Sequence, residues 1–514
     1  MRAIDLFDQG ADAFPDRDCF RWGERALVYR EVQQLSRRIA RGLVEGSFTP
    51  GTKAAVFSPN DPFAFACILG LLRAGLVWLP VNPRNSVEEN AQLLGQLDCE
   101  LLFFHSSLAV SLPAIGAAAP GVRRFLCIDT ELGAWAAEFP AEFTPIPDDP
   151  GALAAISATG GTTGRPKGVM MSQKNFCAFS AGHEQVLNKD YPAVYLAAAP
   201  MTHVAGRLCF PVMKHGGTVV VLEKPDPQAI LAAIPKYRVT RLFLPPTAVY
   251  SLLARPDVRS FDYASLRYFM YGAAPMSVEK LKQAIEVFGP VMTQGYGQTE
   301  APMLLARLSP EDHFAGGRLG GALADDARLA SCGRPTPFVQ VEIMDESGAL
   351  LPRGAAGEIV VRGDIVMQGY YKDPKATEEA FRFGWLHTGD VGRFDDEGYL
   401  HIVDRRKDMI ISGGFNVFSA EVEQAILALP GVQDCAVIGV PDDKWGESVK
   451  AIVQPLPGAA LDARGIIDAC RPRLGGVKTP KTVEIWPELP RSPAGKVLKR
   501  AIRERYWQGR ERKL

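Results

Sequence analysis

The sequence lacks an excess of charge of either sign. Its 514 residues contain 57 Lys and Arg against 58 Asp and Glu, a formal net charge of −1. Proteins that bind nucleic acids usually carry a basic patch and a basic surplus, so this balance argues against nucleic acid as a partner. The apolar fraction of 47% and the charged fraction of 22% are ordinary for globular proteins, and the length predicts about three domains or subdomains.

The sequence also lacks paired cysteines. Its nine cysteines are an odd number, and none forms a C-x-x-C pair. This pattern argues against a disulfide framework or a zinc site and favours reduced, buried thiols in a cytoplasmic protein. The first residues, MRAIDLFDQGADAF, contain early acids and no long apolar core, which does not fit a secretory signal.

An uninterrupted apolar run long enough to span a membrane is absent as well. The best candidate, residues 63–81, carries Arg73 near its centre and Pro80 near its end. A buried helix, a turn at Gly75 and a strand is the better interpretation. We therefore expect no transmembrane segment. No internal repeat or low-complexity tract is present either.

What the sequence does contain is an alternation of strand-like and helix-like segments. Strands are expected at 53–59, 76–81, 216–222 and 241–246, and helices at 63–75 and 227–237. This alternation predicts an α/β fold with parallel sheets. After about residue 330 the segments VQVEIMD, GEIVVRG and GYLHIVD, separated by Gly-containing turns, predict a small β-rich subdomain. The charged segment 404–410 is a suitable domain boundary, followed by a C-terminal domain of roughly 100 residues.

The stretch SATGGTTGRPKG, residues 157–168, has the composition of a phosphate-binding loop. Its glycines let backbone N–H groups turn toward an anion after a buried strand, and Lys167 adds a mobile cation. The Walker A pattern fails here, because Lys167 follows Arg-Pro rather than Gly and precedes Gly168. The dinucleotide-binding G-x-G-x-x-G pattern fails too. Taken alone, the loop is equally consistent with a surface turn.

Four further short stretches carry chemically useful side chains. They are YGAAP (271–275), YGQTE (296–300), HTGD (387–390) and RSPAGKVLKR (491–500). Tyr296 has a ring that could stack on a base, and Glu300 an oxygen suited to Mg²⁺. Asp390 suits a pair of ribose hydroxyls, and Lys496 projects from a loop. Each motif in isolation is equally or better explained as an ordinary turn, packed segment or solvated tail.

The ordered set of these motifs, together with WLHTGD and DRRKDMIISGGFNVFSAEVE, resembles the adenylate-forming superfamily. This superfamily comprises acyl- and aryl-CoA synthetases, peptide-synthetase adenylation domains and firefly-type luciferases, and the resemblance covers nearly the whole chain. It implies a large N-terminal domain (residues 1–406) of two α/β subdomains plus a β-barrel subdomain, and a small mobile α+β C-terminal domain (residues 407–514). Lys407 occupies the position of the family's hinge.

The resemblance implies a ligase that acts in two steps. A carboxylate attacks the α-phosphate of ATP to give an acyl-adenylate and pyrophosphate, and a thiol then displaces AMP. Cations and aligned donors must screen the meeting anions. ATP, Mg²⁺ and coenzyme A are the implied cofactor and co-substrates. Glu300 would carry the metal, Thr299 would touch the α-phosphate, and Lys496 would bridge the carboxylate and the α-phosphate. The loop residues Thr159, Thr162, Thr163 and Lys167 would hold the β- and γ-phosphates.

By the same resemblance, adenine would lie on Tyr296 beside Gly272, Ala273 and Ala274, and the ribose on Asp390 with help from Arg405. After rotation about Lys407, Gly413 and Gly414 would replace Lys496 at the site and, with Trp445, line a pantetheine tunnel. Glycines leave backbone without side chains, as a narrow tunnel requires. Val477 cannot stack on the CoA adenine, which leaves Lys478 and Lys481 to hold the CoA nucleotide.

The acid-binding part is the least defined by the sequence. His203 resembles a pocket-wall histidine of the family, although a buried structural histidine explains it equally well. Gly295 is small enough to leave room for a substrate, and Val204, Ala205, Tyr271, Pro302 and Met303 are its expected apolar or aromatic neighbours. A fatty or aryl acid is therefore favoured over an amino acid, within fatty acid metabolism or a related pathway. Three alternatives stay open: a carrier-protein acceptor in place of CoA, a non-catalytic nucleotide-binding relative, and a homodimer as the assembly.

Overall fold

Two large mixed sheets form the body of the molecule. The computed structural model describes residues 1–159, 167–187, 191–202, 204–405, 408–412, 415–442, 445–492 and 496–508. The seven-stranded sheet has a parallel centre and the order β18-β8-β7-β4-β3-β5-β6. Its strands are β3 (Lys53–Phe57), β4 (Val77–Pro80), β5 (Leu101–Phe104), β6 (Arg124–Cys127), β7 (Leu153–Thr159), β8 (Lys167–Ser172) and β18 (Gly369–Tyr370).

The nine-stranded sheet also has a parallel centre, and its order is β15-β14-β13-β12-β11-β9-β10-β1-β2. The strands are β1 (Asp18–Trp22), β2 (Arg25–Val28), β9 (Val194–Ala197), β10 (Thr218–Val221), β11 (Arg241–Leu244), β12 (Tyr268–Gly272), β13 (Met292–Gln298), β14 (Ala301–Leu308) and β15 (Arg334–Pro335). The expected strands at 53–59, 76–81, 216–222 and 241–246 are confirmed, as is the parallel α/β arrangement.

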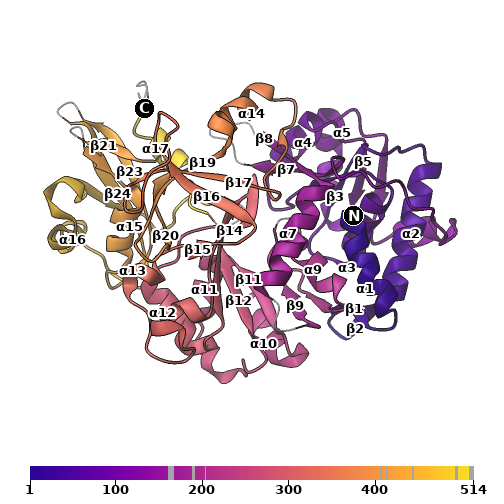
Figure 1. The fold of residues 1–514 in the computed structure, drawn as a ribbon, viewed down its shortest axis with the longest axis horizontal. Coiled ribbons are helices and arrows are strands. Elements are labelled where there is room, and N and C mark those ends of the chain that lie inside the picture. Colours follow the sequence, from indigo (N-terminus) through magenta and orange to yellow (C-terminus); the bar gives the residue numbers. More distant parts are fainter. Residues whose placement is uncertain are drawn as a thin grey trace.

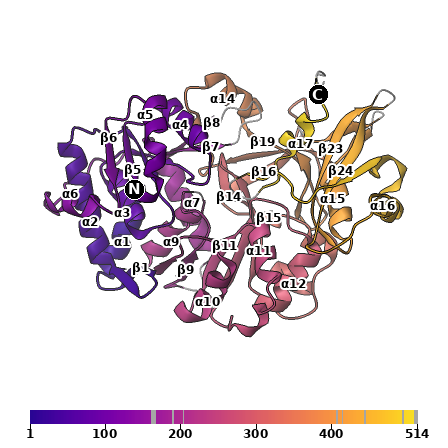
Figure 2. The same ribbon diagram turned by 180° about the vertical axis from the view of Figure 1, so that it is seen from behind.

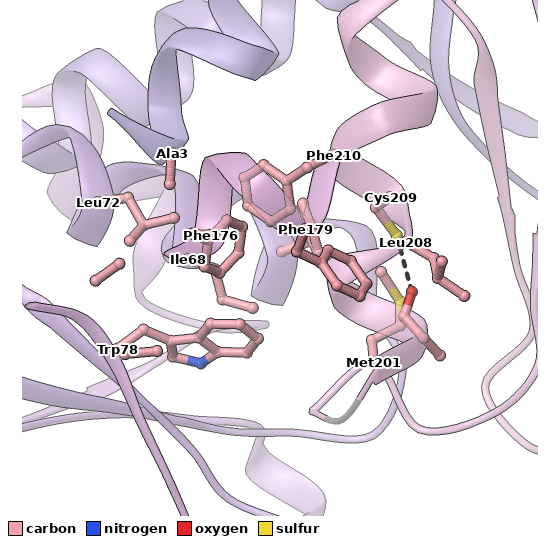
Figure 3. Packing of buried hydrophobic residues seen from close by; sticks show 14 of the residues in the cluster. Ala3, Ile68, Leu72, Trp78, Phe176, Phe179, Met201, Leu208, Cys209 and Phe210 are labelled. Atoms are coloured by element: carbon pink, nitrogen blue, oxygen red, sulfur yellow. Dashed lines mark hydrogen bonds between the residues drawn. The ribbon is translucent and has the colours of Figure 1, made fainter. Parts of the chain in front are cut away.

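Helices cover the outer faces of these sheets and fill the space between them. The main buried cluster lies between the two sheets and includes α1 (Ala3–Ala13), α2 (Tyr29–Glu45), α3 (Pro62–Arg73), α7 (Gln173–Val186) and α9 (Cys209–Lys214). Figure 3 shows part of it, where Phe176 and Phe179 of α7 gather with Phe210 and where the Cys209 thiol donates to the carbonyl of Ala205. A second cluster backs the nine-stranded sheet with α10 (Pro227–Tyr237), α11 (Pro246–Leu253) and α12 (Val278–Phe288). A third backs the seven-stranded sheet with α4 (Val87–Gln96) and α5 (Leu112–Ala118).

Local sequence explains where α3 begins and why its arginine can be buried. The Asp61 carboxylate caps the helix by accepting from the N–H groups of Phe63 and Ala64, and Pro62 occupies the first helical position. Arg73, the last residue of α3, is buried and forms a bidentate ion pair with the Asp8 carboxylate at 2.7 and 2.8 Å. The expected helix, turn and strand over residues 63–81 are thus confirmed. No helix in the described ranges is both long and apolar enough to cross a membrane.

A smaller antiparallel sheet joins the large sheets to the C-terminal domain. Its order is β16-β17-β19-β20, and it forms the curled half-barrel of the N-terminal domain. Its strands are β16 (Val339–Met344), β17 (Gly357–Gly363), β19 (Leu386–Phe394) and β20 (Leu400–Arg405). Figures 1 and 2 show this sheet between the nine-stranded sheet and the gold C-terminal region, at the end of the molecule away from α2. The helix α14 (Pro374–Ala380) lies near β8 and β18.

The C-terminal domain has a sheet and buried clusters of its own. In this sheet β24 pairs with β21, β23 and β25, and β21 pairs with β22. The strands are β21 (Ile410–Ser412), β22 (Phe415–Val417), β23 (Val432–Asp442), β24 (Gly446–Pro455) and β25 (Thr482–Ile485), and the helices are α15 (Ser419–Leu427), α16 (Ala463–Lys478) and α17 (Lys499–Glu504). The domain buries its own apolar side chains on both faces of the sheet.

Candidate active site

The YGQTE motif forms a tight hairpin at the end of the nine-stranded sheet. Strand β13 ends at Gln298, Thr299 and Glu300 make the turn, and β14 begins at Ala301. The pairing shifts by one residue between Tyr296 and Gln298, which is a β-bulge, and Met303 has a positive φ of 49°. A side chain at Gly297 would come within 2.1 Å of the Met303 backbone nitrogen. The bulge therefore brings the two strands too close together for any residue but glycine at this position.

Tyr296 and Asp390 meet in the interior between the hairpin and the half-barrel. The Tyr296 hydroxyl donates to Asp390 Oδ2 at 2.7 Å, and both side chains are buried. Burial, reinforced by the Asp390 carboxylate, raises the pKa of Tyr296 well above its ordinary value. The Asp390 backbone N–H donates to Thr388 Oγ1, which fixes the HTGD turn. Two residues that lie 94 positions apart are thus held together, as the implied adenine and ribose contacts would require.

Arg405 lies directly across the strand pair from Asp390. The register of β19 and β20 pairs Asp390 with Arg405 and Val391 with Asp404. Cross-strand partners point to the same face of a sheet. The backbone therefore places Arg405 beside Asp390, while the Arg405 side chain lies outside the described part of the structure.

Glu300 is linked to the phosphate loop by a tyrosine that motif reasoning missed. The Tyr370 hydroxyl donates to Glu300 Oε1 at 2.8 Å, and the Lys167 ammonium lies 4.8 Å from the centre of the Tyr370 ring. The Met367 N–H also donates to the Glu300 carbonyl. Burial and the Glu300 carboxylate raise the pKa of Tyr370. Nothing in the composition of residues 357–371 distinguishes Tyr370 from Tyr371.

The phosphate loop connects two paired strands of the seven-stranded sheet. Strands β7 and β8 are antiparallel, and Thr159 pairs with Lys167 across the base of the loop. Thr162 and Thr163 lie outside the described residues. Behind the base, the buried Arg207 of α8 (Val204–Arg207) donates to Ser157 Oγ at 2.7 Å, and burial lowers its pKa to about 10. This guanidinium was not singled out by any motif, yet it fixes the strand that leads into the loop.

The YGAAP motif ends β12 and lies tightly against β13. Gly272 pairs with Gly295, and a Cβ on Gly272 would come within 2.4 Å of the Gly295 carbonyl oxygen. Ala273 adopts a left-handed φ of 67° and is exposed, whereas Ala274 is half-buried. Small residues here permit a close backbone approach, which is the property that the sequence interpretation gave them.

On the acid-binding side, the structure differs from the expectations for Gly295 and Tyr271. The space beside Gly295 holds the Met303 methyl group, since a Cβ on Gly295 would lie 3.0 Å from Met303 Cε. Tyr271 was expected beside the substrate, but its hydroxyl contacts His313 Nε2 at 3.2 Å and its ring belongs to the cluster that backs the sheet. Alternation along β12 places Tyr271 and Gly272 on opposite faces, so Tyr271 cannot line a pocket at Gly272. His203 lies outside the described residues, while Ala205 is buried in α8 and Pro302 in β14.

In the C-terminal domain, Lys496 is exposed on a short turn. The Ser492 N–H donates to the Lys496 carbonyl at 2.7 Å, and the Lys496 N–H donates to Ser492 Oγ at 3.2 Å. Arg491 and Val497 form a single antiparallel bridge on either side of it, and residues 493–495 lie outside the described residues. The structure does not bring Lys496 together with Glu300 through any described contact.

The expected tunnel face forms the edge of the C-terminal sheet. Ser412 of β21 pairs with Phe415 of β22 and with Gly446 of β24; Gly413, Gly414 and the hinge residue Lys407 lie outside the described residues. Around it, Ile411, Phe415 and Trp445 are 37%, 63% and 44% exposed. Exposed apolar residues that gather on one edge often mark a binding surface.

The two lysines expected to hold the CoA nucleotide already have partners. Lys478 Nζ donates to both carboxylate oxygens of Glu421 at 2.8 Å, and Lys481 Nζ donates to the carbonyl of Gly476. Val477 is 42% exposed. The lysines would have to exchange these partners to bind a phosphate.

A buried polar network holds the C-terminal domain against the half-barrel. Asp404 of β20 accepts hydrogen bonds from the N–H and the hydroxyl of Ser419, the first residue of α15. Lys499 Nζ donates to Ser419 Oγ at 2.8 Å and lies 2.7 Å from Glu423 Oε1. Arg503 of α17 pairs with Asp408 at 2.6 Å. The bonds between Asp404 and Ser419 span the expected boundary between residues 406 and 407, whereas the pairs of Lys499 and Arg503 lie on its C-terminal side.

Among the described residues, no group of three or more His, Cys, Asp or Glu side chains is arranged to hold a metal ion. A triphosphate supplies most of the oxygens that Mg²⁺ requires, so one or two protein carboxylates suffice in nucleotide sites. Glu300 fits this role, because it is partly exposed at the hairpin turn and the Tyr370 hydroxyl engages only Oε1.

Family models match both parts of the chain. Residues 7–371 match the AMP-binding enzyme family, and residues 421–496 match the AMP-binding enzyme C-terminal domain. The chain is 37% identical over 499 residues to a feruloyl-CoA synthase of an Amycolatopsis species, covering 96% of each protein. It is 35% identical over 481 residues to the medium/long-chain-fatty-acid–CoA ligase FadD8 of Mycobacterium tuberculosis, covering 89% of this chain and 82% of the relative. A fatty acid–[acyl-carrier-protein] ligase, ScoC of Streptomyces coeruleorubidus, is 31% identical over 500 residues, covering 95% and 93%.

Solved structures agree over almost the full length. ATP-bound MatB from Rhodopseudomonas palustris has a TM-score of 0.88 and 31% identity, covering 98% of this chain and 99% of that protein. The amide bond synthetase McbA of Marinactinospora thermotolerans has a TM-score of 0.88 and 32% identity, covering 98% and 100%. The resemblance on which the sequence analysis relied is therefore confirmed. The chain belongs to the adenylate-forming superfamily of AMP-binding enzymes and, within it, to the acid–thiol ligases.

Proposed function

We propose that the protein is an AMP-forming acyl-CoA ligase that activates a fatty or aryl carboxylic acid with MgATP and transfers the acyl group to coenzyme A. The observation that carries this proposal is the joining of Tyr296 to Asp390 and of Glu300 to Lys167 through Tyr370. Four of the residues that the resemblance assigns to the nucleotide thus form two linked pairs around one hairpin.

The first step needs an anionic acid to meet an anionic triphosphate. A carboxylate oxygen attacks the α-phosphorus, and pyrophosphate leaves. Lys167 at the loop base supplies a cation for the departing β- and γ-phosphates, together with Thr159 and the expected donors Thr162 and Thr163. Lys496 bridges the carboxylate and the α-phosphate. Because the acid is already ionised, this lysine needs only to position and screen charge and no general base is required.

Tyr296 and Asp390 hold the nucleoside. The adenine ring rests on Tyr296 beside Gly272, Ala273 and Ala274, whose small side chains permit a close approach. The Asp390 carboxylate accepts hydrogen bonds from the ribose hydroxyls. The Tyr296 hydroxyl holds this carboxylate in place, and Arg405 lies opposite Asp390 on the neighbouring strand. Thr299 reaches the α-phosphate from the hairpin turn. Mg²⁺, held by Glu300 and the phosphates, would neutralise charge that develops on the phosphate oxygens.

The second step exchanges the residues at the site. We place the domain boundary between residues 406 and 407, with Lys407 as the hinge about which the C-terminal domain rotates. Rotation removes Lys496 and delivers Gly413 and Gly414, with Trp445 beside them. The exposed side chains Ile411, Phe415 and Trp445 support an apolar arriving face. The thiol sulfur then attacks the acyl carbon, AMP leaves and the thioester forms.

Coupled assays on purified protein test this proposal. With a panel of aryl, alicyclic and C4 to C12 acids, we expect pyrophosphate release to depend on the acid, and AMP and thioester to appear only when CoA is added. Acid-dependent pyrophosphate release without any CoA-dependent product would contradict the proposal that CoA is the acceptor. Absence of pyrophosphate release with every acid would contradict the whole proposal.

A carrier-protein thiol is the second candidate acceptor, because ScoC is named as a ligase for acyl-carrier protein. Substituting a pantetheinylated carrier protein for CoA in the same assay separates the two: a faster rate with the carrier would favour the alternative. The nine buried, disulfide-free cysteines support a cytoplasmic location. A homodimer stays a proposal that sedimentation of the purified protein tests.

A further inference from the structure

A buried histidine lies inside the N-terminal domain, at a place that no motif points to. His183 of α7 is 2% exposed, and neither of its ring nitrogens has a hydrogen-bond partner among the residues that the structure describes. Its ring lies tilted at 59° against the Phe179 ring, with the ring centres 4.5 Å apart. A buried polar group without a partner is unfavourable, and such exceptions in native proteins call for an explanation. An absent ligand is one explanation that an experiment can examine.

A second buried polar group without a partner comes from a different element. Arg307 of β14 makes no hydrogen bond or ion pair through its guanidinium in the part of the chain that the structure describes, and its Nε is fully buried. Its main contact is the face of the Tyr268 ring, 5.9 Å away. Burial lowers the pKa of Arg307, and the nearby Tyr268, Glu311 and Asp312 offset this shift only in part.

His183 and Arg307 influence each other electrostatically. Burial, together with the charges of Arg241 and Arg307, lowers the pKa of His183 to about 3. At neutral pH the imidazole is therefore uncharged and can donate from one nitrogen and accept at the other. Arg241 differs from its neighbours, because it donates to the Leu187 carbonyl at 3.0 Å. Of these three groups, His183 and Arg307 are the two without a hydrogen-bond partner in the described part of the chain.

Both groups face the side of the sheet on which the acid is expected to bind. Tyr268 and Met270 of β12 belong to the cluster between the two large sheets, whereas Phe269 and Tyr271 belong to the cluster behind. Alternation therefore places Gly272 on the inner face with Tyr268. Gly295 pairs with Gly272, and Arg307 pairs with Gly295, so Arg307 is on this face too.

Helix α7 covers this inner face. Phe176 and Phe179 are buried in the cluster between the sheets, and His183 follows Phe179 by four residues on the same side of the helix. From Gly272 at the nucleotide end, the strand runs back four residues to Tyr268, about 13 Å at the usual rise per residue. An acid that enters over Gly272 with its carboxyl toward the α-phosphate would direct its far end toward Arg307 and His183.

We infer that the acid substrate carries an oxygen function at the end distal to its reactive carboxyl, and that this oxygen accepts hydrogen bonds from Arg307 and His183. The inference rests on the proposed function and adds a distal polar group to the fatty or aryl acid proposed there. A hydroxyl, a carbonyl or a second carboxylate would satisfy the same donors. A site built to hydrogen-bond a substrate group discriminates strongly against the analogue that lacks it, because its own buried groups then stay unpaired.

The test compares acids that differ only at the distal end. The pairs are cinnamic acid with its 4-hydroxy, 4-acetyl and 4-carboxy derivatives, and nonanoic acid with nonanedioic acid. Acid-dependent pyrophosphate release gives kcat/KM for each. We expect at least one oxygen-bearing member to exceed its apolar counterpart by about tenfold or more. The three 4-substituents distinguish the hydroxyl, carbonyl and carboxylate sources.

Two variants assign the preference to these side chains. Arg307→Met and His183→Leu should each lower the oxygen-to-apolar ratio by about tenfold, mainly through KM, while the apolar acids keep their rates or improve. His313→Phe is the control, because His313 is equally buried but already bonded to Tyr271 and Ser309; it should lower stability and leave the ratio unchanged.

Binding provides a readout that does not depend on turnover. A non-hydrolysable acyl-adenylate analogue with the preferred distal oxygen should bind the parent protein about tenfold more tightly than its apolar counterpart, and Arg307→Met should remove the difference. Apolar acids that are activated as well as their oxygenated partners, with ratios unchanged in both variants, would overturn the inference and leave the ligase proposal intact. Failure of every acid to release pyrophosphate would overturn both.

Discussion

At the scale of single residues, two carboxylates of the site are held by hydrogen bonds, whereas the Lys167 ammonium has no hydrogen bond in the described structure that would prevent it from binding a phosphate. Asp390 is held by Tyr296, and Glu300 by Tyr370, through hydroxyls that cannot neutralise a carboxylate. Lys167 rests on the Tyr370 ring, and a ring face attracts a cation without taking its charge. The cation is therefore oriented in advance and still able to move to a phosphate oxygen.

Removing the Tyr370 hydroxyl should disturb Glu300 without removing it. Hydrogen bonds to charged groups contribute about 1.5 to 3 kcal/mol, so Tyr370→Phe should lower kcat/KM for ATP by about tenfold or more and raise the Mg²⁺ concentration needed for half-maximal rate. Initial rates over a magnesium titration measure both effects. Tyr371→Phe is the matched control, since the Tyr371 hydroxyl donates to Asp98 instead. Equal losses in the two variants would contradict the role of Tyr370.

The buried histidine at position 183 also predicts how stability depends on pH. The unfolded chain can protonate this imidazole below pH 6.5, while the folded protein resists protonation until about pH 3. Unfolding therefore takes up a proton in this window, and the histidine's contribution to stability, complete above pH 6.5, is lost as the pH falls. His183→Leu should make the free energy of unfolding fall less steeply, by about 1.4 kcal/mol per pH unit. Urea unfolding at pH 7, 6 and 5 measures the slopes, and parallel curves for the two proteins would contradict the assignment.

At the scale of elements, close backbone approach decides which residues are tolerated. Gly272 and Gly295 bring β12 and β13 together at the nucleotide end, and the bulge at Gly297 turns the hairpin that carries Thr299 and Glu300. The position of the turn that carries Thr299 and Glu300 therefore depends on these three glycines, because each permits close approach of a neighbouring strand. Strand pairing thus determines the geometry of the site.

Gly272→Ala tests this dependence. The added methyl would meet the Gly295 carbonyl at 2.4 Å, and backbone on both sides leaves little room to yield. We expect a loss of stability of about 1 to 3 kcal/mol and a rise in KM for ATP of tenfold or more. Gly133→Ala in the short helix α6 (Leu132–Ala137) is the control, because its new methyl would meet no atom within 4 Å. Thermal unfolding and ATP kinetics compare the two, and a fully active Gly272→Ala protein would show that the strands can separate freely.

At the scale of the whole molecule, a polar contact joins the C-terminal domain to the half-barrel near the expected boundary. Asp404 before the boundary accepts from Ser419 after it, while Asp408 and Arg503 pair within the C-terminal domain. Polar contacts of this kind can exchange partners, as relative domain motion requires. Such an exchange fits an enzyme that uses two faces of one domain in succession.

Two substitutions should separate the two steps of the reaction. Lys496→Ala removes the cation that we propose bridges the acid and the α-phosphate, so acid-dependent pyrophosphate release should fall by at least 100-fold, while added acyl-adenylate should still react with CoA. Gly414→Leu should block the arriving face and do the reverse. Pyrophosphate release and thioester formation are measured separately on each variant. Loss of both steps in a well-folded Lys496→Ala protein would contradict the assigned role.

Much of the molecule could be predicted from its sequence, because the relevant signals are local. Apolar runs such as residues 53–57 and 218–221 became strands, and the ordered motifs identified the family. Tyr370, Arg207, His183 and Arg307 could not be recognised, because their importance comes from which elements pack together. Tyr271 was misplaced for the same reason: the facing of one strand depends on the sheet around it.

The distribution of sulfur in the chain has a chemical consequence for an enzyme that makes thioesters. All nine cysteines are buried and free, and burial raises the pKa of eight of them: Cys19, Cys67, Cys99, Cys177, Cys209, Cys332, Cys435 and Cys470. An acyl-adenylate acylates whatever thiolate it meets, and a protonated, buried thiol is a poor nucleophile. The protein's own thiols are thereby protected from acylation, and the acyl-adenylate persists until it reacts with the acceptor thiol.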